Sequence, residues 1–341
     1  MVKYLIIGGA GFTGVNFSDI LLSRGDHVVI FDNFSREGTL HNIIWLRKKH
    51  PEIEIVQGDI RVDRKKLFEC VSHVDIVHHL GAQVAVTTSV VDPRLDFEIN
   101  AMGTFNVMEA VRKSKNKPIV IYASTNKVYG GMEEVAIVEK EGRYVYRDLV
   151  EGVDESMPLD FHSPYGCSKG SGDQYTIDYA RIYGLRTAVM RQSCVYGRHQ
   201  LGIEDQGWVA WFVIAAVLGR KITIYGDGKQ VRDVLFVNDL FTVWDTVVRK
   251  LQPGKSLVYN IGGGPDNTMS LLELISHIEN LMGKKVEYAF DSWRPGDQRV
   301  YVSNIKKARN DLKWKPEVSP KEGVEILFEW VSRNKDVFKY V

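Results

Sequence analysis

Short apolar runs alternate with amphipathic segments through the first half of the chain. Residues 3–7 and 27–31 are apolar runs of strand length, and the segment between them has apolar residues at helical spacing. Alternation of this kind is typical of a parallel sheet covered by helices on both faces. We therefore predict an α/β fold built on a doubly wound, Rossmann-type parallel sheet. Further strands are expected at residues 53–56, 76–79, 119–122 and 187–190, and helices at residues 63–71, 97–112 and 164–183.

The pattern changes after residue 190, where glycines and aromatic residues become more frequent and the apolar segments become shorter. We expect a Rossmann domain over residues 1–190, to which residues 231–262 return. Residues 191–230 and 263–341 are expected to form a smaller C-terminal lobe. Residues 133–151 are charged and weakly periodic, which predicts a surface insertion.

Composition narrows the classes of function. The chain has 341 residues, with 44 basic and 43 acidic side chains, so no charge field indicates binding to nucleic acid or to an anionic membrane. The longest apolar stretch, residues 208–218, is far shorter than the roughly 20 residues that span a bilayer. The first strand begins at once, which leaves no room for a signal peptide. The three cysteines, Cys70, Cys167 and Cys194, form neither a disulfide framework nor a metal-binding pattern, so we expect a cytoplasmic protein without a metal.

A glycine-rich turn directly follows the first strand. Gly8, Gly11 and Gly14 have the spacing G-x-x-G-x-x-G, a variant of the dinucleotide-binding fingerprint. Glycines permit a tight turn and the close approach of backbone amides to a pyrophosphate, which the N-terminus of the next helix stabilises. The turn therefore predicts a dinucleotide site.

Asp32 ends the second predicted strand. A carboxylate at this position accepts hydrogen bonds from both hydroxyls of the adenine ribose and repels a 2′-phosphate. The sequence therefore favours NAD over NADP. Arg36, four residues further on, keeps NADP open as an alternative.

Tyr165 and Lys169 stand four residues apart in a segment predicted to be helical, which would place them on one face. The ammonium of Lys169 would then lower the pKa of the Tyr165 phenol from its usual value of about 10. Thr125 supplies a hydroxyl upstream. A tyrosine base, a lysine and a hydroxyl are what a protein needs to take the proton from an alcohol while a nicotinamide takes its hydride.

These residues, together with further motifs that follow in order along the chain, make the sequence similar to a known family. Along nearly its whole length the chain resembles the extended short-chain dehydrogenases/reductases of the nucleotide-sugar epimerase and dehydratase type. The matching positions are residues 8–14, 32–33, 58–60, 79–82, Asn100 with 103–104, 128–130, 163–166, Lys169, Arg191, 196–197, 225–228, 232–233, 260–263 and 294–297.

The resemblance implies NAD as the cofactor and Thr125, Tyr165 and Lys169 as the catalytic residues. The C-terminal lobe would bind a nucleotide sugar. The implied cofactor-binding residues are Gly8, Gly11, Phe12, Thr13, Gly14, Asp32, Asn33, Ser35, Arg36, Asp59, Ile60, Leu80, Ala82, Gln83, Asn100, Ser124, Tyr165 and Lys169. The implied substrate-binding residues are Thr125, His162, Gln206, Tyr225, Arg232, Arg294 and Asp297.

Within that set, Arg232 and Arg294 would hold the pyrophosphate of the substrate, because a guanidinium binds phosphate oxygens bidentately. Tyr225 and Asp297 would contact the nucleoside end. His162 either touches the sugar or serves as a structural residue at the helix entrance, and both interpretations stay open, as does the role of Cys194.

Asn126 and Lys127 help to choose among the reactions of this family. Its sugar 4,6-dehydratases carry an Asp-Glu pair here, and the elimination of water needs such an acid and base, so dehydration is not expected. Residues 124–130, 161–170, 205–208 and 228–233 are similar to the 2-epimerases of CDP-linked hexoses. This similarity implies inversion at C2, through a transient 2-keto sugar, of a CDP-hexose of the paratose/tyvelose or glucose/mannose kind.

Two alternatives remain: a 4-epimerase of UDP-glucose or UDP-galactose type, and a protein that binds NAD without turnover. The natural sugar and the base of the nucleotide are left open. Members of the family commonly pair through two helices each, which implies a homodimer or homotetramer formed through residues 93–113 and 164–183.

Overall fold

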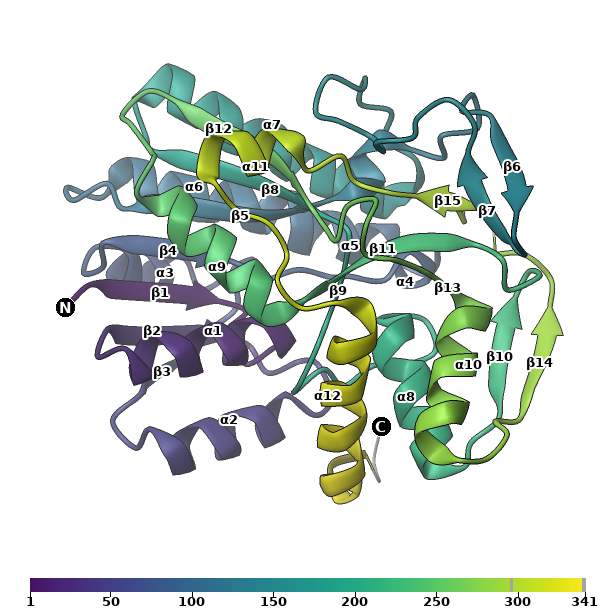
Figure 1. Cartoon of the computed structure of the whole chain (residues 1–341). Helices are drawn as coiled ribbons and strands as arrows, with labels where there is room; N and C mark the ends of the chain where they lie inside the picture. Colours follow the sequence, from purple (N-terminus) through teal and green to yellow (C-terminus); the bar gives the residue numbers. More distant parts are fainter. Residues whose placement is uncertain (295–296, 339–341) are drawn as a thin grey trace. The chain divides into compact units, whose positions relative to one another are not determined.

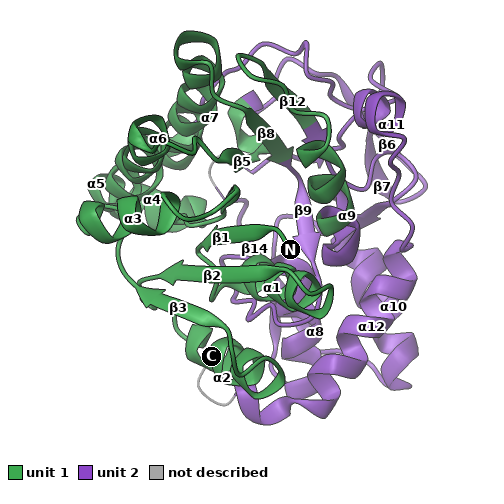
Figure 2. Ribbon diagram, turned by 90° about the vertical axis from the view of Figure 1, so that its left-hand side faces the viewer, with its two compact units in different colours: residues 1–128, 163–191, 241–259 green, residues 129–162, 192–240, 260–341 purple. Residues whose placement is uncertain are grey.

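The computed structural model describes residues 1–294 and 297–338, so Pro295 and Gly296 of the motif at 294–297 lie outside the described residues. The chain divides into two compact units (Figure 2). Unit 1 comprises Met1–Val128, Ser163–Arg191 and Phe241–Tyr259, and unit 2 comprises Tyr129–His162, Gln192–Leu240 and Asn260–Val341. The boundaries differ from the expected ones because residues 129–162 belong to unit 2 and a shorter segment, residues 241–259, returns to unit 1.

A seven-stranded sheet forms the centre of unit 1, with the strand order β12-β8-β5-β4-β1-β2-β3 (Figure 1). The pairs β4–β5, β1–β4, β1–β2 and β2–β3 are parallel, as the alternation of strands and helices predicts. Leu5 of β1 pairs with Val29 of β2 and Val77 of β4. The strands are β1 (Lys3–Ile7), β2 (His27–Asp32), β3 (Glu54–Gln57), β4 (Ile76–His79), β5 (Ile119–Thr125), β8 (Thr187–Gln192) and β12 (Ser256–Ile261).

Helices cover both faces of this sheet. Alternate residues of a strand point to opposite faces, so Leu5 and Ile7 pack against α3, α6 and α7. On the other face, Phe17 of α1 packs edge-on against Trp244 of α9, with ring centroids 5.3 Å apart. The helices are α1 (Phe12–Ser23), α2 (Thr39–Lys49), α3 (Arg64–Val71), α4 (Val86–Val91), α5 (Pro93–Phe97), α6 (Gly103–Lys113), α7 (Ser163–Tyr183) and α9 (Val237–Val248), of which residues 241–248 belong to unit 1.

The helix expected at residues 97–112 is broken into pieces. A π-helical turn, η1 (Glu98–Met102), lies between α5 and α6 and contains Asn100. Asp92 caps α5 by accepting a hydrogen bond from the backbone N–H of Leu95 at 2.9 Å, and Pro93 follows it at the first helical position. Wide turns of the π type are frequent at functional sites, because they displace one side chain from the helical register.

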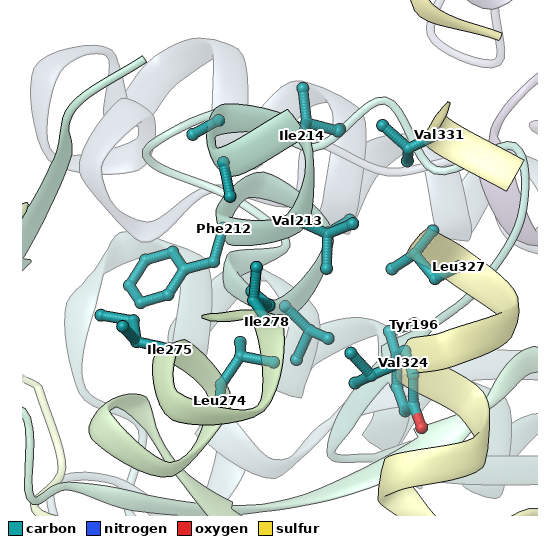
Figure 3. Packing of buried hydrophobic residues seen from close by; sticks show 14 of the residues in the cluster. Tyr196, Phe212, Val213, Ile214, Leu274, Ile275, Ile278, Val324, Leu327 and Val331 are labelled. Carbon is teal, nitrogen blue, oxygen red and sulfur yellow. The ribbon is translucent and has the colours of Figure 1, made fainter. Parts of the chain in front are cut away.

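Unit 2 has its own hydrophobic core, built mainly by α8, α10 and α12 (Figure 3). Figure 3 shows Phe212 and Val213 of α8 facing Ile275 and Ile278 of α10. The apolar stretch at residues 208–218 is therefore a core helix. The helices of unit 2 are α8 (Trp208–Leu218), α10 (Leu271–Met282), α11 (Lys306–Leu312) and α12 (Pro320–Arg333), with short 3-10 turns at η2 (Asn126–Tyr129), which begins in unit 1, and at η3 (Lys335–Phe338).

Small sheets complete unit 2. The expected insertion at residues 133–151 contains an antiparallel hairpin, β6 (Ile137–Lys140) with β7 (Arg143–Tyr146). Strand β11 (Val231–Phe236) pairs with β9 (Cys194–Tyr196), β13 (Thr268–Ser270) and β15 (Val300–Tyr301), and β10 (Ile222–Tyr225) pairs with β14 (Tyr288–Asp291). Among the described helices of the whole chain, none is long and apolar enough to cross a membrane.

Candidate active site

The glycine-rich turn of unit 1 packs tightly against the end of β4. Gly8 has φ +77°, and a Cβ there would lie 2.6 Å from the backbone nitrogen of Gly81. A Cβ at Gly14 would lie 2.5 Å from the Cα of Gly9. Gly11 is the N-cap of α1 and supplies no side-chain cap, so the first N–H groups of this helix are left for another acceptor. Phe12 and Thr13 form the start of the helix.

Asp32 lies at the carboxyl end of β2 and is tied to the same turn. Its carboxylate accepts hydrogen bonds from the backbone N–H of Ala10 at 3.0 Å and of Phe34 at 2.9 Å. Burial raises the pKa of Asp32, and these hydrogen bonds oppose the rise. Ser35 and Arg36 follow in an exposed segment, where the backbone N–H of Ser35 donates to the Asn33 side chain.

Asp59, at the end of β3, is held by two side chains. Arg61 donates to it from Nη2 at 2.8 Å and from Nε at 3.0 Å, and Asn33 donates to it at 3.0 Å. The bonds from Arg61 lower the pKa of Asp59 to about 2. Ile60 is a buried core residue rather than an exposed one. The sequence did not lead us to predict a role for Arg61, although Arg61 stands only two residues after Asp59.

The loop after β4 is fastened by a buried amide. The Asn100 side chain accepts from the backbone N–H of Gln83 at 3.0 Å and donates to the Gln83 carbonyl at 3.0 Å. The backbone N–H of Leu80 donates to the Ile7 carbonyl at 2.9 Å. Ala82 lies between them and is half-buried. Asn100 therefore holds the loop through side-chain bonds to its backbone.

Thr125 ends β5, and Tyr165 lies in the first turn of α7; both side chains are buried. The two are hydrogen-bonded, which lowers the pKa of Tyr165, but burial is the larger effect and Asp96 adds to it. The pKa of Tyr165 is therefore raised to about 12. This corrects the expectation that Lys169 lowers the pKa of Tyr165. Helical spacing places two residues on one face, but the pKa of a phenol also depends on how strongly burial destabilises its charged form.

Lys169 is 3 % exposed, and its ammonium points toward β5. Nζ donates to the Ala123 carbonyl at 2.5 Å and lies 4.3 Å from the centroid of the Tyr122 ring. Burial lowers the pKa of Lys169 to about 7, while the carboxylates of Asp173 and Asp96 oppose this fall. Near neutral pH both the charged and the neutral form of Lys169 are therefore populated.

Two buried carboxylates near Lys169 were missed from the sequence. Asp173, fully buried on α7, accepts from Nε of Arg191 at 2.9 Å and from the Ser124 hydroxyl at 2.7 Å. Asp96, fully buried on α5, accepts from the Ser168 hydroxyl. One signal was available for Asp173, which stands four residues after Lys169 on the same helix.

Apart from Thr125, which belongs to unit 1, the predicted substrate residues lie in unit 2, and both arginines among them are ion-paired. Arg232 Nη2 lies 2.7 Å from Oδ1 of Asp297. Arg294 Nη2 lies 2.9 Å from Oδ1 of Asp205, and the Arg294 guanidinium lies 3.7 Å from the centroid of the Tyr225 ring. The acids that pair with these arginines were not predicted as partners.

The remaining candidates of unit 2 have local partners. His162 is half-exposed, and its Nε2 lies 2.9 Å from Oδ2 of Asp160. The backbones of Gln206 and Ile203 bond to each other at 3.0 and 3.1 Å, closing a short turn. Cys194 accepts a hydrogen bond from the indole N–H of Trp208 at 3.4 Å, which is a structural contact.

A doubly wound parallel sheet with a glycine-rich turn, an acid after β2 and a buried Thr–Tyr–Lys set defines a dehydrogenase/reductase-type α/β protein. The family model described as GDP-mannose 4,6 dehydratase matches residues 5–327, and the chain belongs to this extended short-chain dehydrogenase/reductase family.

Its relatives include epimerases. The chain is 44% identical to CDP-paratose 2-epimerase of Salmonella typhi over 97% of its own length and 99% of the relative. It is 32% identical to UDP-glucose 4-epimerase of Mycolicibacterium smegmatis over 98% of its length and 99% of that protein. Among solved structures, UDP-glucose 4-epimerase of Thermotoga maritima with UDP-glucose superposes with a TM-score of 0.83 at 28% identity, covering 98% of this chain and 99% of the other. The UDP-glucose 4-epimerase of Thermus thermophilus in complex with NAD has a TM-score of 0.81 at 28% identity, covering 97% and 99%.

Proposed function

We propose that this protein is an NAD-dependent epimerase that inverts C2 of a CDP-linked hexose through a transient 2-keto sugar. The observation that carries the proposal is the buried set of Thr125, Tyr165 and Lys169, next to an amide and an ammonium at Asn126 and Lys127. This set suits proton transfer to and from an alcohol, while its neighbours lack the carboxylates that eliminate water. The similarity to CDP-paratose 2-epimerase supports the choice of C2 and of a cytidine nucleotide.

The residues of unit 1 fit NAD by their chemistry. The N–H groups at the start of α1 suit a pyrophosphate, because Gly11 gives them no side-chain acceptor. Asp32 suits the ribose hydroxyls, since the backbone bonds from Ala10 and Phe34 hold its carboxylate at the end of β2. Asn33 and Arg61 donate hydrogen bonds that fix the Asp59 carboxylate, which would lie at the adenine end of NAD. When bound, NAD supplies a reversible hydride acceptor.

The phenolate form of Tyr165 takes the proton of the C2 hydroxyl in the first half-reaction, and the resulting phenol returns a proton to the C2 oxygen in the second. Thr125 shares a hydrogen bond with Tyr165 and steadies the reacting oxygen. Lys169 would hold the cofactor ribose when NAD is bound, and its ammonium would stabilise the phenolate form of Tyr165. The net redox change is zero, so tight retention of the cofactor would suit this cycle.

Unit 2 supplies the recognition of the nucleotide sugar. Arg232 and Arg294 bind the pyrophosphate. Its oxygens replace the carboxylates of Asp297 and Asp205 as partners of the two guanidinium groups. Tyr225 lies against the Arg294 guanidinium and contacts the nucleoside. In this proposal Asp297 serves the nucleoside end, while His162 and Gln206 contact the sugar.

We also propose that the protein forms a homodimer through α5–α6 and α7, with a homotetramer as a further possibility. Phe97 is exposed on α5 and Met102 on η1, and Tyr175 and Ile182 are exposed on α7. Large exposed apolar residues concentrated on neighbouring helices are typical of a subunit interface. The cytoplasmic location stays a prediction from the sequence.

The test is incubation of the purified protein with CDP-paratose, CDP-tyvelose, CDP-glucose and UDP-glucose, with the product identified by NMR. We expect inversion at C2 of a CDP-sugar. Inversion at C4 of UDP-glucose would favour the 4-epimerase alternative, for which the similarity to UDP-glucose 4-epimerases provides the specific support. Cofactor binding with no product from any nucleotide sugar would favour the non-catalytic alternative.

A further inference from the structure

A short acidic turn of unit 2 contacts side chains to which the proposed function assigns the substrate. The turn consists of residues 203–206, shortly before α8, and we call it the acidic strap. The backbones of Ile203 and Gln206 bond to each other at 3.0 and 3.1 Å, which closes the strap on itself. Its tip carries two neighbouring exposed acids, Glu204 and Asp205.

The two ends of the acidic strap are anchored to α8. The Gly207 carbonyl accepts a hydrogen bond from the backbone N–H of Trp211 at 2.9 Å. At the other end, Gly202 packs so closely on α8 that a Cβ there would lie 2.7 Å from the same backbone nitrogen. Gly207 has φ +79°, a conformation that favours glycine. The base of the strap is therefore fixed by backbone packing.

The tip of the strap is held by side chains instead. Nη2 of Arg294 lies 2.9 Å from Oδ1 of Asp205, and both Nη atoms of Arg294 donate to the Glu204 carbonyl at 3.4 Å. The Tyr225 hydroxyl donates to Oε1 of Glu204 at 3.1 Å. In the part of the chain that the structure describes, Glu204 and Asp205 have no other polar partner. The tip is thus attached through Arg294 and Tyr225.

The acidic strap and a bound diphosphate need the same N–H groups of Arg294. The guanidinium lies 3.7 Å from the centroid of the Tyr225 ring, which leaves the N–H groups at its edge to bind an anion. The ion pair with Asp205 is only partly buried, since the Arg294 and Asp205 side chains are 24 % and 47 % exposed. Such a pair is weak. A diphosphate has more charge and more acceptor oxygens than one carboxylate, so it can displace Asp205.

We propose that the acidic strap is a latch on the substrate-binding arginine, and that the diphosphate of the ligand opens it. Asp205 is the residue that sets this requirement, because its carboxylate must leave Arg294 before a phosphate takes its place. The role rests on the proposed function, in which Arg294 binds the pyrophosphate of a nucleotide sugar. A nucleoside without phosphates carries no anion that could displace Asp205, so the strap favours nucleoside diphosphates over nucleosides.

The experiment compares the Kd of CDP and of cytidine for the purified wild type and Asp205→Asn, by isothermal titration calorimetry. Neither ligand carries a sugar that could be turned over, so binding alone is measured. Asp205→Asn should bind CDP about two- to fivefold more tightly, which corresponds to the loss of a partly exposed ion pair. Its affinity for cytidine should equal that of the wild type. Equal or weaker binding of CDP, or an equal gain for cytidine, would overturn the proposal.

Glu204→Gln is the matched control for charge. The amide oxygen of glutamine still accepts from the Tyr225 hydroxyl, and Asp205 keeps its contact with Arg294. This variant therefore removes one negative charge from the strap without opening the latch, and its CDP affinity should stay close to that of the wild type. A gain as large as that of Asp205→Asn would reduce the effect to general repulsion between the strap and the ligand, and the latch would be refuted.

A double-mutant cycle with Arg294→Gln isolates the pair of side chains. Arg294→Gln should weaken CDP binding, and in this background Asp205→Asn should have no effect, because no guanidinium is left to release. The same gain in both backgrounds would contradict the latch.

Failure of the latch and failure of the proposed function give different results. A wild type that binds CDP, without a gain in Asp205→Asn, refutes the latch alone. A wild type that binds UDP in preference to CDP contradicts the proposed cytidine nucleotide, and the same comparison made with UDP then decides on the latch, because the base takes no part in it. A wild type that binds neither nucleotide contradicts both proposals.

Discussion

The ammonium of Lys169 lies 4.3 Å from the centroid of the Tyr122 ring, two buried groups that face each other between α7 and β5. A cation over an aromatic face is stabilised by the ring quadrupole, by up to about 2 kcal/mol when both are removed from water. The tyrosine hydroxyl in turn lies 3.3 Å from the Lys169 carbonyl, to which it donates. Tyr122 therefore contacts Lys169 twice: its ring faces the ammonium, and its hydroxyl bonds to the Lys169 carbonyl in the backbone of α7.

These two contacts of Tyr122 are separable by substitution. Tyr122→Phe keeps the ring face and should leave the pKa of Lys169 close to that of the wild type. Tyr122→Leu removes the ring, destabilises the ammonium and should lower the pKa of Lys169 by up to about one unit. The pH dependence of kcat/KM for the two variants checks this. Equal profiles would show that the ring does not support the charge.

Tyr165→Phe removes the proton-transfer group and little else. We expect turnover to fall by at least about a hundredfold, while the cofactor stays bound, because proton transfer by a positioned side chain contributes this much or more. Steady-state rates and the absorbance of the retained cofactor provide the measurement. A variant that keeps more than about a tenth of the wild-type rate would remove Tyr165 from the base role.

The cofactor preference should follow Asp32. Extraction of the purified protein should yield NAD, since a carboxylate at the end of β2 repels a 2′-phosphate. Asp32→Asn should weaken NAD binding and narrow the preference for NAD over NADP. The check is chromatography of the extracted nucleotide together with binding titrations of both cofactors. Recovery of mainly NADP from the wild type would contradict the assignment.

The route of the C2 hydrogen distinguishes two chemistries. If C2 is oxidised, deuterium at C2 passes to the cofactor and returns to the same carbon on the opposite face, so the product keeps its label in ordinary water. Removal of the hydrogen as a proton would expose it to exchange with solvent. Mass spectrometry and NMR of the product measure the label. Its complete loss would be incompatible with direct oxidation at C2, even if inversion at C2 were found.

Acid sensitivity should depend on His78, which is fully buried beside Tyr4, Phe17 and Trp244. Burial lowers the pKa of His78 from 6.5 to about 3. Above pH 6.5 neither the folded nor the unfolded state is protonated at this residue, whereas between about pH 6.5 and 3 the unfolded state takes up a proton. The free energy of unfolding should thus fall as pH falls, by up to about 1.4 kcal/mol per pH unit from this residue.

His78→Phe offers the test of that contribution. Phenylalanine keeps an aromatic ring in the cluster and removes the titrating group, so the slope of the unfolding free energy against pH should decrease by about 1.4 kcal/mol per unit below pH 6.5. His41→Phe, at an exposed position, is the control. Denaturant unfolding at a series of pH values gives the slopes, and equal slopes in His78→Phe and wild type would contradict the assignment.

The sequence by itself determined the class of fold and the local motifs. Apolar runs such as residues 3–7, alternating with helices, predict a parallel sheet. A strand that is buried on both faces needs apolar side chains at consecutive positions, and this pattern is visible in the sequence. The glycine turn, Asp32 and the four-residue spacing of Tyr165 and Lys169 were readable for the same reason, since each depends on near neighbours in the chain.

The tertiary structure decided what depends on burial and on distant partners. Asp96 and Ser168 are 72 positions apart in the sequence, and only folding brings them into contact. The expected depression of the Tyr165 pKa became a rise to about 12, because the free energy of a charge depends on the solvent that folding removes from it. Residues 129–162 belong to unit 2 although the segments before and after them, Met1–Val128 and Ser163–Arg191, belong to unit 1. Spacing along a chain specifies local geometry, whereas desolvation and long-range pairing are properties of the packed molecule.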